Sequence, residues 1–163
     1  MDTLFAALSQ GQINQLKGAP TLITILVAGA DGTIDSQELN WAEKLTHIRS
    51  YADANEGLNE FYASIEPTFG ADLETMLDKF PDSQGERESV ISAELTQLNG
   101  VLAILDNPTA YALYKSFTSF AEHIAKASGG FLRFGSISSE EKKWITLPMI
   151  DPIILETPEE EIE

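Results

Sequence analysis

Apolar residues recur at alternating steps of four and three along the second half of the chain. One series is Ile91, Leu95, Leu98, Leu102 and Leu105, and the next is Leu113, Phe117, Phe120, Ile124 and Ala127. This spacing is typical of helices that pack at a shallow angle. Between the two series, Asp106-Asn107-Pro108 offers capping side chains and a proline suited to a first helical turn. We therefore expect a helix over residues 88–105 and, after a tight turn, a second long antiparallel helix.

The N-terminal pattern predicts two helices that separate near Pro20. Residues 3–16 carry a helical apolar pattern, which Gly11 interrupts. Pro20 suits the first turn of a second helix, because a proline there loses no hydrogen bond. Residues 22–30 are apolar almost all round, which indicates burial on every side. The run TLITILV within this stretch also fits a central strand, and periodicity cannot separate the two. We favour a helix because no other segment offers a strand partner.

Shorter amphipathic segments complete an all-α pattern. They cover residues 36–50, 57–65, 71–80 and 139–147, with prolines or glycines near their ends. The stretch 151–163 holds two prolines and six acids, so we expect order there only if it docks on the rest of the chain. The sequence thus predicts an all-α fold, a compact bundle of about seven or eight helices. Residues 1–150 form a single domain, and residues 151–163 form an acidic C-terminal tail.

Composition restricts the chemistry and the partners. The formal net charge is −16, and the stretch 53–94 alone has eleven acids and two bases. Nucleic acids and anionic lipids are bound mainly through Lys and Arg, so we expect neither as a partner. The absence of cysteine excludes disulfides and thiolate metal sites and makes a cytoplasmic location the simplest expectation. We expect no signal peptide and no insertion into a membrane, since the longest apolar run is far too short.

An internal repeat relates two short segments 103 residues apart. Residues 32–41 (GTIDSQELNW) match residues 135–144 (GSISSEEKKW), and the two tryptophans of the chain occupy equivalent positions. Each copy is typical of a helix start. Asp35 and Ser138 stand at the N-cap position, and Glu38 and Glu141 follow three residues later as capping-box partners. Gly32 fits a turn that needs a positive φ. Helix capping alone can explain both glutamates, and a pseudo-two-fold repeat is expected.

The segment 30–38 (ADGTIDSQE), after an apolar helix, resembles the signature of TerB-like tellurite-resistance domains. The second copy resembles the second half of that family, so the likeness covers most of residues 20–148. The resemblance implies an all-α, non-enzymatic bacterial stress-response protein that binds a divalent metal cation and has a membrane-associated protein partner. The net charge also allows a basic protein partner. It makes Asp31, Asp35 and Glu38 the metal contacts, with Glu141 as a fourth if the two helix starts meet. In the second copy, Phe134 and Ser138 stand where the first copy has Asp31 and Asp35.

Other metal or catalytic sites fit the sequence less well. An EF-hand would place Val27 and Gly29 at ligand positions where neither can bind calcium. A di-metal helical bundle needs Glu-x-x-His pairs, and neither His47 nor His123 has a glutamate three residues before it. We expect Glu43 and His47 to pair on one helix face, and His123 to be partly buried and hydrogen-bonded. Nucleophile-elbow and phosphate-loop motifs are absent from the sequence, so we do not expect an enzyme.

A protein-interaction module without a metal requirement is the alternative function. The acidic middle segment or the acidic tail would bind a basic partner. Aromatic side chains within the acidic segment, namely Phe61, Tyr62 and Phe69, would anchor that partner if they are exposed.

Overall fold

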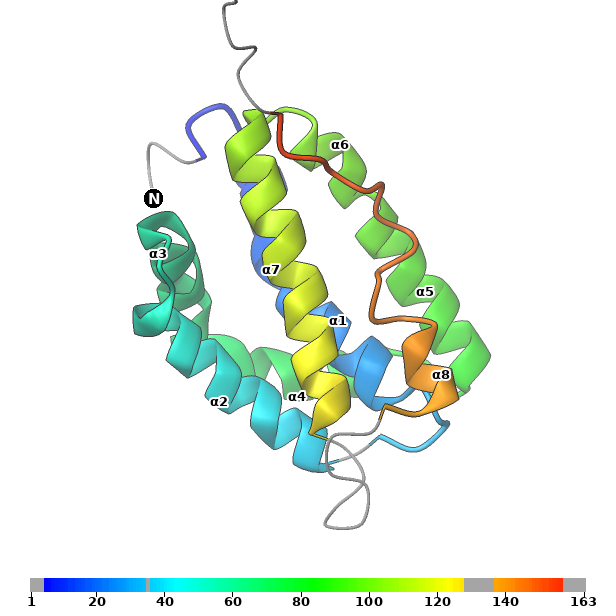
Figure 1. The fold of residues 1–163 in the computed structure, drawn as a ribbon. Coiled ribbons are helices and arrows are strands. Elements are labelled where there is room, and N and C mark those ends of the chain that lie inside the picture. Colours follow the sequence, from blue (N-terminus) through cyan, green and yellow to red (C-terminus); the bar gives the residue numbers. More distant parts are fainter. Residues whose placement is uncertain (1–4, 35, 128–136, 157–163) are drawn as a thin grey trace, which may run out of the picture.

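The chain folds into a bundle of helices around one central helix. The computed structural model describes residues 5–34, 36–127 and 137–156, and no β-strand occurs in these ranges. In chain order the helices are α1 (Gln10–Ala28), α2 (Ser36–Ala52), α3 (Glu56–Ile65), the 3-10 turn η1 (Glu66–Thr68), α4 (Phe69–Lys79), α5 (Gln84–Thr96), α6 (Leu98–Leu102), α7 (Asn107–Lys126) and α8 (Ser139–Lys142). Helix α1 contacts each of α2 to α7 and lies at the centre of the bundle (Figure 1). The all-α prediction is confirmed.

Helix α1 is one helix where the sequence predicted two. Ser9 caps its start, because the Ser9 hydroxyl accepts from the Gln12 N–H and the Gln12 side chain accepts from the Ser9 N–H. The prediction of a helix start at Pro20 was wrong, since the helix continues through this residue. An internal proline costs about 3 kcal/mol. Burial of an apolar side chain contributes about 1.5 to 3 kcal/mol. Residues 19–28 are all buried, so packing outweighs the proline.

The two long apolar series form helices at the expected places, but the first of these helices is interrupted. The first series is split between α5 and α6 by a tighter turn at Gln97, whose N–H reaches the Glu94 carbonyl at 3.2 Å. Helix α7 begins as predicted, because the Asp106 side chain accepts from the Thr109 N–H. The α5–α6 segment and α7 run in opposite directions (Figure 1), and both pack on α1. Helix α1 therefore packs against both members of this antiparallel pair.

Aromatic side chains of α3, α4 and α7 fill the core. Phe61, Tyr62 and Phe69 are 0%, 0% and 1% exposed, so the prediction that they are surface anchors was wrong. Their helices carry apolar residues at helical spacing, and both α3 and α4 pack on α1 and α2. The rings of Phe61 and Tyr62 also contact Phe117 and Phe120 of α7. Among the described residues, the large apolar side chains at the surface are instead Ile48, Tyr51, Val90, Ile104, Ile154 and Leu155.

A partly buried polar cluster links α2, α3 and α7, and we refer to Arg49, Tyr62, Ser116 and Ser119 as the Arg49 node. The Arg49 guanidinium donates to the Tyr62 hydroxyl at 3.1 Å, to the Ser116 carbonyl at 2.8 Å and to the Ser119 hydroxyl at 3.0 Å. The guanidinium also lies 5.4 Å from the centres of the Tyr62 and Phe120 rings. The node therefore joins the neighbouring helices α2 and α3 to the distant helix α7.

The C-terminal part departs from the predicted helix. Helix α8 ends at Lys142, whereas the sequence predicted a helix over 139–147. Residues 143–146 form turns, and Leu147 has a φ of 49°. The following Pro148 disfavours the helical region for Leu147, but it does not account for the end of α8 at Lys142. No helix of the described residues is long and apolar enough to cross a bilayer.

Candidate functional site

The loop of the first motif copy follows the end of α1 and has the turn geometry expected from its glycine. Gly29 ends α1, and the Gly32 N–H donates to the Gly29 carbonyl at 3.0 Å. Gly32 has a φ of 93°, as predicted for this position. The Asp31 side chain is exposed and accepts from the Thr33 N–H at 3.1 Å, so this carboxylate closes a local turn.

The two motif glutamates are buried at the starts of their helices. Glu38 is 1% exposed in the first turn of α2, and Glu141 is 4% exposed in α8. The Ser138 hydroxyl accepts from the Glu141 N–H at 3.2 Å, which confirms the predicted N-cap of the second copy. The equivalent Asp35 lies outside the described residues, as does Gly135. Helix α2 has seventeen residues and α8 has four, and the pseudo-two-fold repeat is not confirmed.

Two side chains of α5 clamp this loop, and sequence reasoning missed both. Arg87 is 6% exposed and donates to the carbonyls of Gly29 at 3.3 Å and Asp82 at 3.4 Å. The Gln84 amide donates to the Ala30 carbonyl at 2.6 Å. A guanidinium at the C-terminal end of α1 balances the partial negative charge of that helix end. The same positive charge disfavours a second cation in the adjacent loop.

Substitution of Gly29 tests this clamp. A Cβ atom at Gly29 would lie 2.6 Å from Arg87 Nη2 and 3.1 Å from the Ile25 carbonyl, so Gly29→Ala should destabilise the fold by about 1 to 2 kcal/mol. Gly18 within α1 is the matched control, because a Cβ atom there meets nothing within 4 Å. Gly18→Ala should stabilise by about 0.5 to 1 kcal/mol through helix propensity. Urea unfolding of both variants measures the difference. Equal effects would show that the Arg87 side chain moves aside and is not held in place against Gly29.

The acidic residues predicted as metal contacts are not gathered into a recognisable metal centre in the part of the chain that the structure describes. No three His, Asp or Glu side chains of that part form a metal-ligating group, and Asp31, Glu38 and Glu141 are therefore not one. Asp31 is exposed, whereas the two glutamates are buried. Their assignment as cation contacts, with Asp35 as the fourth residue, stays a prediction.

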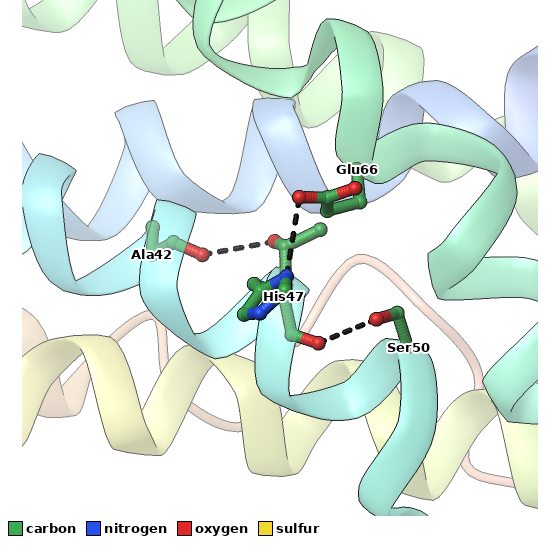
Figure 2. A network of polar contacts seen from close by, with 5 residues as sticks. Ala42, His47, Ser50 and Glu66 are labelled. Atoms are coloured by element: carbon green, nitrogen blue, oxygen red, sulfur yellow. Dashed lines mark hydrogen bonds and ion pairs between the residues drawn. The ribbon is translucent and has the colours of Figure 1, made fainter.

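The two histidines have surface partners. Figure 2 shows His47 paired with Glu66, with Nδ1 3.2 Å from Oε1, whereas the sequence favoured Glu43 as its partner. Glu43 instead lies beside Gly70, where its carboxylate would be 3.2 Å from an added Cβ. The His47 side chain is 62% exposed, so this pair contributes at most about 1 kcal/mol. His123 is exposed rather than partly buried as predicted, and its Nδ1 lies 2.8 Å from the Ser119 carbonyl oxygen.

Exposed carboxylates occur at every fourth position from the middle of α4 to the first turn of α5, and we refer to this set as the acidic surface. It consists of Glu74, Asp78, Asp82 and Glu86. Lys79 is the one base between positions 74 and 86. The next base, Arg87, has its guanidinium drawn inward against Gly29. No ion pair found among the described residues involves any of these four carboxylates. The surface therefore has a net negative charge that its own neighbours do not neutralise.

The comparisons with known proteins give the chain no family. It matches no protein-family model, no curated protein and no solved structure. The likeness to TerB-like domains thus rests on the motif residues in segment 30–38 and on their repeat at 135–144. Membership of that family stays a prediction.

Proposed function

We propose that this chain is a non-enzymatic binding protein whose acidic surface docks a basic protein partner. The observation that carries this proposal is the uncompensated charge of the acidic surface, together with the inward position of Arg87. Four carboxylates on consecutive segments present one sign of charge to solvent. Such a surface attracts a Lys-rich or Arg-rich partner and accelerates its encounter.

The charges of the acidic surface repel one another in the unbound chain. Glu74 and Asp78 lie one helical turn apart on α4, and a like-charge pair at this spacing costs a few tenths of a kcal/mol. Glu86 gains from the partial positive charge at the start of α5, which offsets part of that repulsion. A basic partner would relieve the remaining repulsion. For this reason we propose that the charge serves to bind a partner, and not only to keep the chain soluble.

The lining of two surface hollows also supports a binding role without chemistry. Hollows of about 310 and 350 Å³ occur at the surface of the described residues, and each is lined by one carboxylate and no histidine. Neither hollow therefore places an acid beside a base. A stress-response role of the TerB-like type remains the proposal for the wider function. In that version Asp31, Asp35, Glu38 and Glu141 hold a divalent cation, but the position of Arg87 favours the metal-free version.

Titration with a capped lysine octapeptide tests the proposal. We expect binding that weakens between about 50 and 200 mM salt, because screening shortens the reach of exposed charges. The variant Glu74→Gln/Asp78→Asn/Asp82→Asn/Glu86→Gln should bind roughly tenfold more weakly, given about 0.4 kcal/mol for each exposed pair. Isothermal titration calorimetry measures both effects on the full chain.

A matched variant controls for net charge. Glu56, Glu122, Glu140 and Glu156 are also exposed, but they lie on α3, α7, α8 and the C-terminal segment. Changing all four to glutamine alters the charge by the same amount and should leave most of the affinity. Equal loss in the two variants would show that the peptide responds to total charge, and the acidic surface would then have no special role.

A further inference from the structure

The C-terminal segment docks on the bundle through two asparagines. We refer to residues 149–156 as the strap. It contains no helix or strand and runs from α8 along the α5–α6 segment towards the start of α7 (Figure 1). Asn99 lies on α6, and Asn107 is the first residue of α7. Each of these two side chains contacts the main chain of the strap.

The two asparagines bind the strap in the same way. Asn99 Nδ2 donates to the Met149 carbonyl at 3.0 Å, and Asn99 Oδ1 accepts from the Asp151 N–H at 2.8 Å. Asn107 repeats this pattern five residues further along the strap. Its Nδ2 donates to the Ile154 carbonyl at 2.9 Å, and its Oδ1 accepts from the Glu156 N–H at 2.8 Å. Each amide therefore pairs with the C=O of one residue and the N–H of the residue two positions on. A neighbouring strand makes the same kind of contact when a peptide adds to a sheet edge.

Apolar contacts add limited selectivity to these hydrogen bonds with the main chain of the strap. Ile150 is 1% exposed, and Ile153 is partly buried against the core. A hollow of about 310 Å³ remains between the strap and the helices, lined among others by Leu102, Ala103 and Ala110. This volume is at the lower end of the range for ligand pockets. The strap thus occupies a groove whose recognition depends on main-chain groups and two isoleucines.

The connection that precedes the strap is strained. Leu147 has a φ of 49°, in the left-handed region that costs a non-glycine residue about 1 to 2 kcal/mol. Pro148 follows it directly and restricts the backbone further. Short connections under strain favour the exchange of a terminal segment between two copies of a chain. Ile104, Ile154 and Leu155 are exposed near the Asn107 contact, and an exchanged pair offers apolar surface to cover them.

We propose that the groove formed by α6 and the start of α7 is a peptide-docking site whose intermolecular occupant is the strap of a second copy of this chain. The strap is the segment whose main chain and isoleucines already match the groove, so an exchanged copy makes the same contacts. This proposal does not depend on the acidic surface, which lies on α4 and α5. The two sites also differ in the sign of their salt dependence. The strap carries Asp151 and Glu156 on an acidic protein, so salt should strengthen its exchange and weaken lysine-peptide binding.

Peptide binding to the full chain tests the groove. The probe is a fluorescent peptide of residues 149–156, followed by polarisation. Ile153→Asp in the full chain weakens the internal strap and leaves the groove residues unchanged. We expect this released variant to bind the peptide at least about tenfold more tightly than the wild type, because the internal competitor is weakened. Adding Asn99→Asp to the released variant replaces a donor by a carboxylate facing the Met149 carbonyl, and should remove the gain.

Light scattering of the wild-type chain after size-exclusion chromatography tests the occupant and needs no substitution. We expect a dimer fraction that grows with protein concentration and falls when the peptide of residues 149–156 is added in excess. The same peptide with both isoleucines replaced by aspartate should leave the dimer intact. A chain that stays monomeric up to about 1 mM overturns the second copy as occupant, even if the released variant binds the peptide. Equal peptide binding with and without Asn99→Asp overturns the groove itself.

Discussion

Phe61→Ala should reduce the free energy of unfolding by about 4 kcal/mol, the largest loss we expect from a single substitution in this chain. Phe61 is fully buried, with its ring centre 6.2 Å from that of Phe5, 5.3 Å from that of Tyr62 and 6.0 Å from that of Phe117. Truncation removes these contacts and leaves a cavity between α3, α7 and the segment that precedes α1. Since domains are stable by only about 5 to 15 kcal/mol, urea unfolding will show a large shift.

Tyr51 provides the control for Phe61. It is an aromatic residue near the end of α2 and is 64% exposed. Tyr51→Ala should change the free energy of unfolding by no more than about 0.5 kcal/mol. If Phe61 were a surface anchor for a partner, both substitutions would be nearly neutral for folding, and that result would contradict the packing described above.

Arg49→Met should destabilise the fold by about 2 to 3 kcal/mol. The methionine keeps much of the side-chain length but cannot donate to Tyr62, Ser116 or Ser119, and hydrogen bonds from a charged donor contribute about 1.5 to 3 kcal/mol. It also loses the stacking of the guanidinium on two rings. Arg49→Lys tests whether the shape of the guanidinium matters, because a single ammonium group cannot contact all the acceptors that the planar guanidinium contacts. A lysine variant as stable as the wild type would show that charge alone is needed.

The Arg49 node also makes a prediction for alkaline pH. Burial raises the pKa of Tyr62 above its ordinary value of 10.0, while the nearby Arg49 charge and the hydrogen bonds from Ser116 and Arg49 lower it in part. Between pH 10 and the raised pKa, Tyr62 is therefore neutral in the folded chain but ionised in the unfolded chain. Its contribution to stability is fully present below pH 10 and decreases as the pH rises through the folded pKa. Arg49→Met removes the largest lowering influence, so the pKa of Tyr62 should rise further.

Periodicity predicted most helices, and local chemistry could have predicted more. The stripe Leu58, Phe61, Tyr62 and Ile65 has the three- and four-residue steps of a buried helix face, so its burial could have been read from the sequence. The pair Ser9 and Gln12 is a capping box, and its recognition would have moved the start of the first helix to its observed place.

Contacts between distant segments could not be predicted from one sequence. Arg87 donates to a carbonyl 58 residues away, and Arg49 reaches a serine 67 residues away. Nothing in the local sequence distinguishes the buried Arg87 or the partly buried Arg49 from solvated arginines. Asn99 and Asn107 present the same difficulty, because their partners on the strap are about fifty residues further along the chain. The continuous helix through Pro20 likewise depends on packing from elsewhere, which overrides the local preference.

Thermal unfolding of the metal-stripped full chain tests the central claim most directly, because a ligand that binds only the native state raises the midpoint. The scans are recorded with the lysine octapeptide and, separately, with Ca²⁺, Mg²⁺, Mn²⁺ and Zn²⁺. We predict that the peptide raises the midpoint and that the variant lacking the acidic surface loses this rise. We also predict that no cation gives a rise that Asp31→Asn or Glu38→Gln abolishes. A cation-specific rise lost in both variants, with no effect of the peptide, would contradict the account and support the metal site.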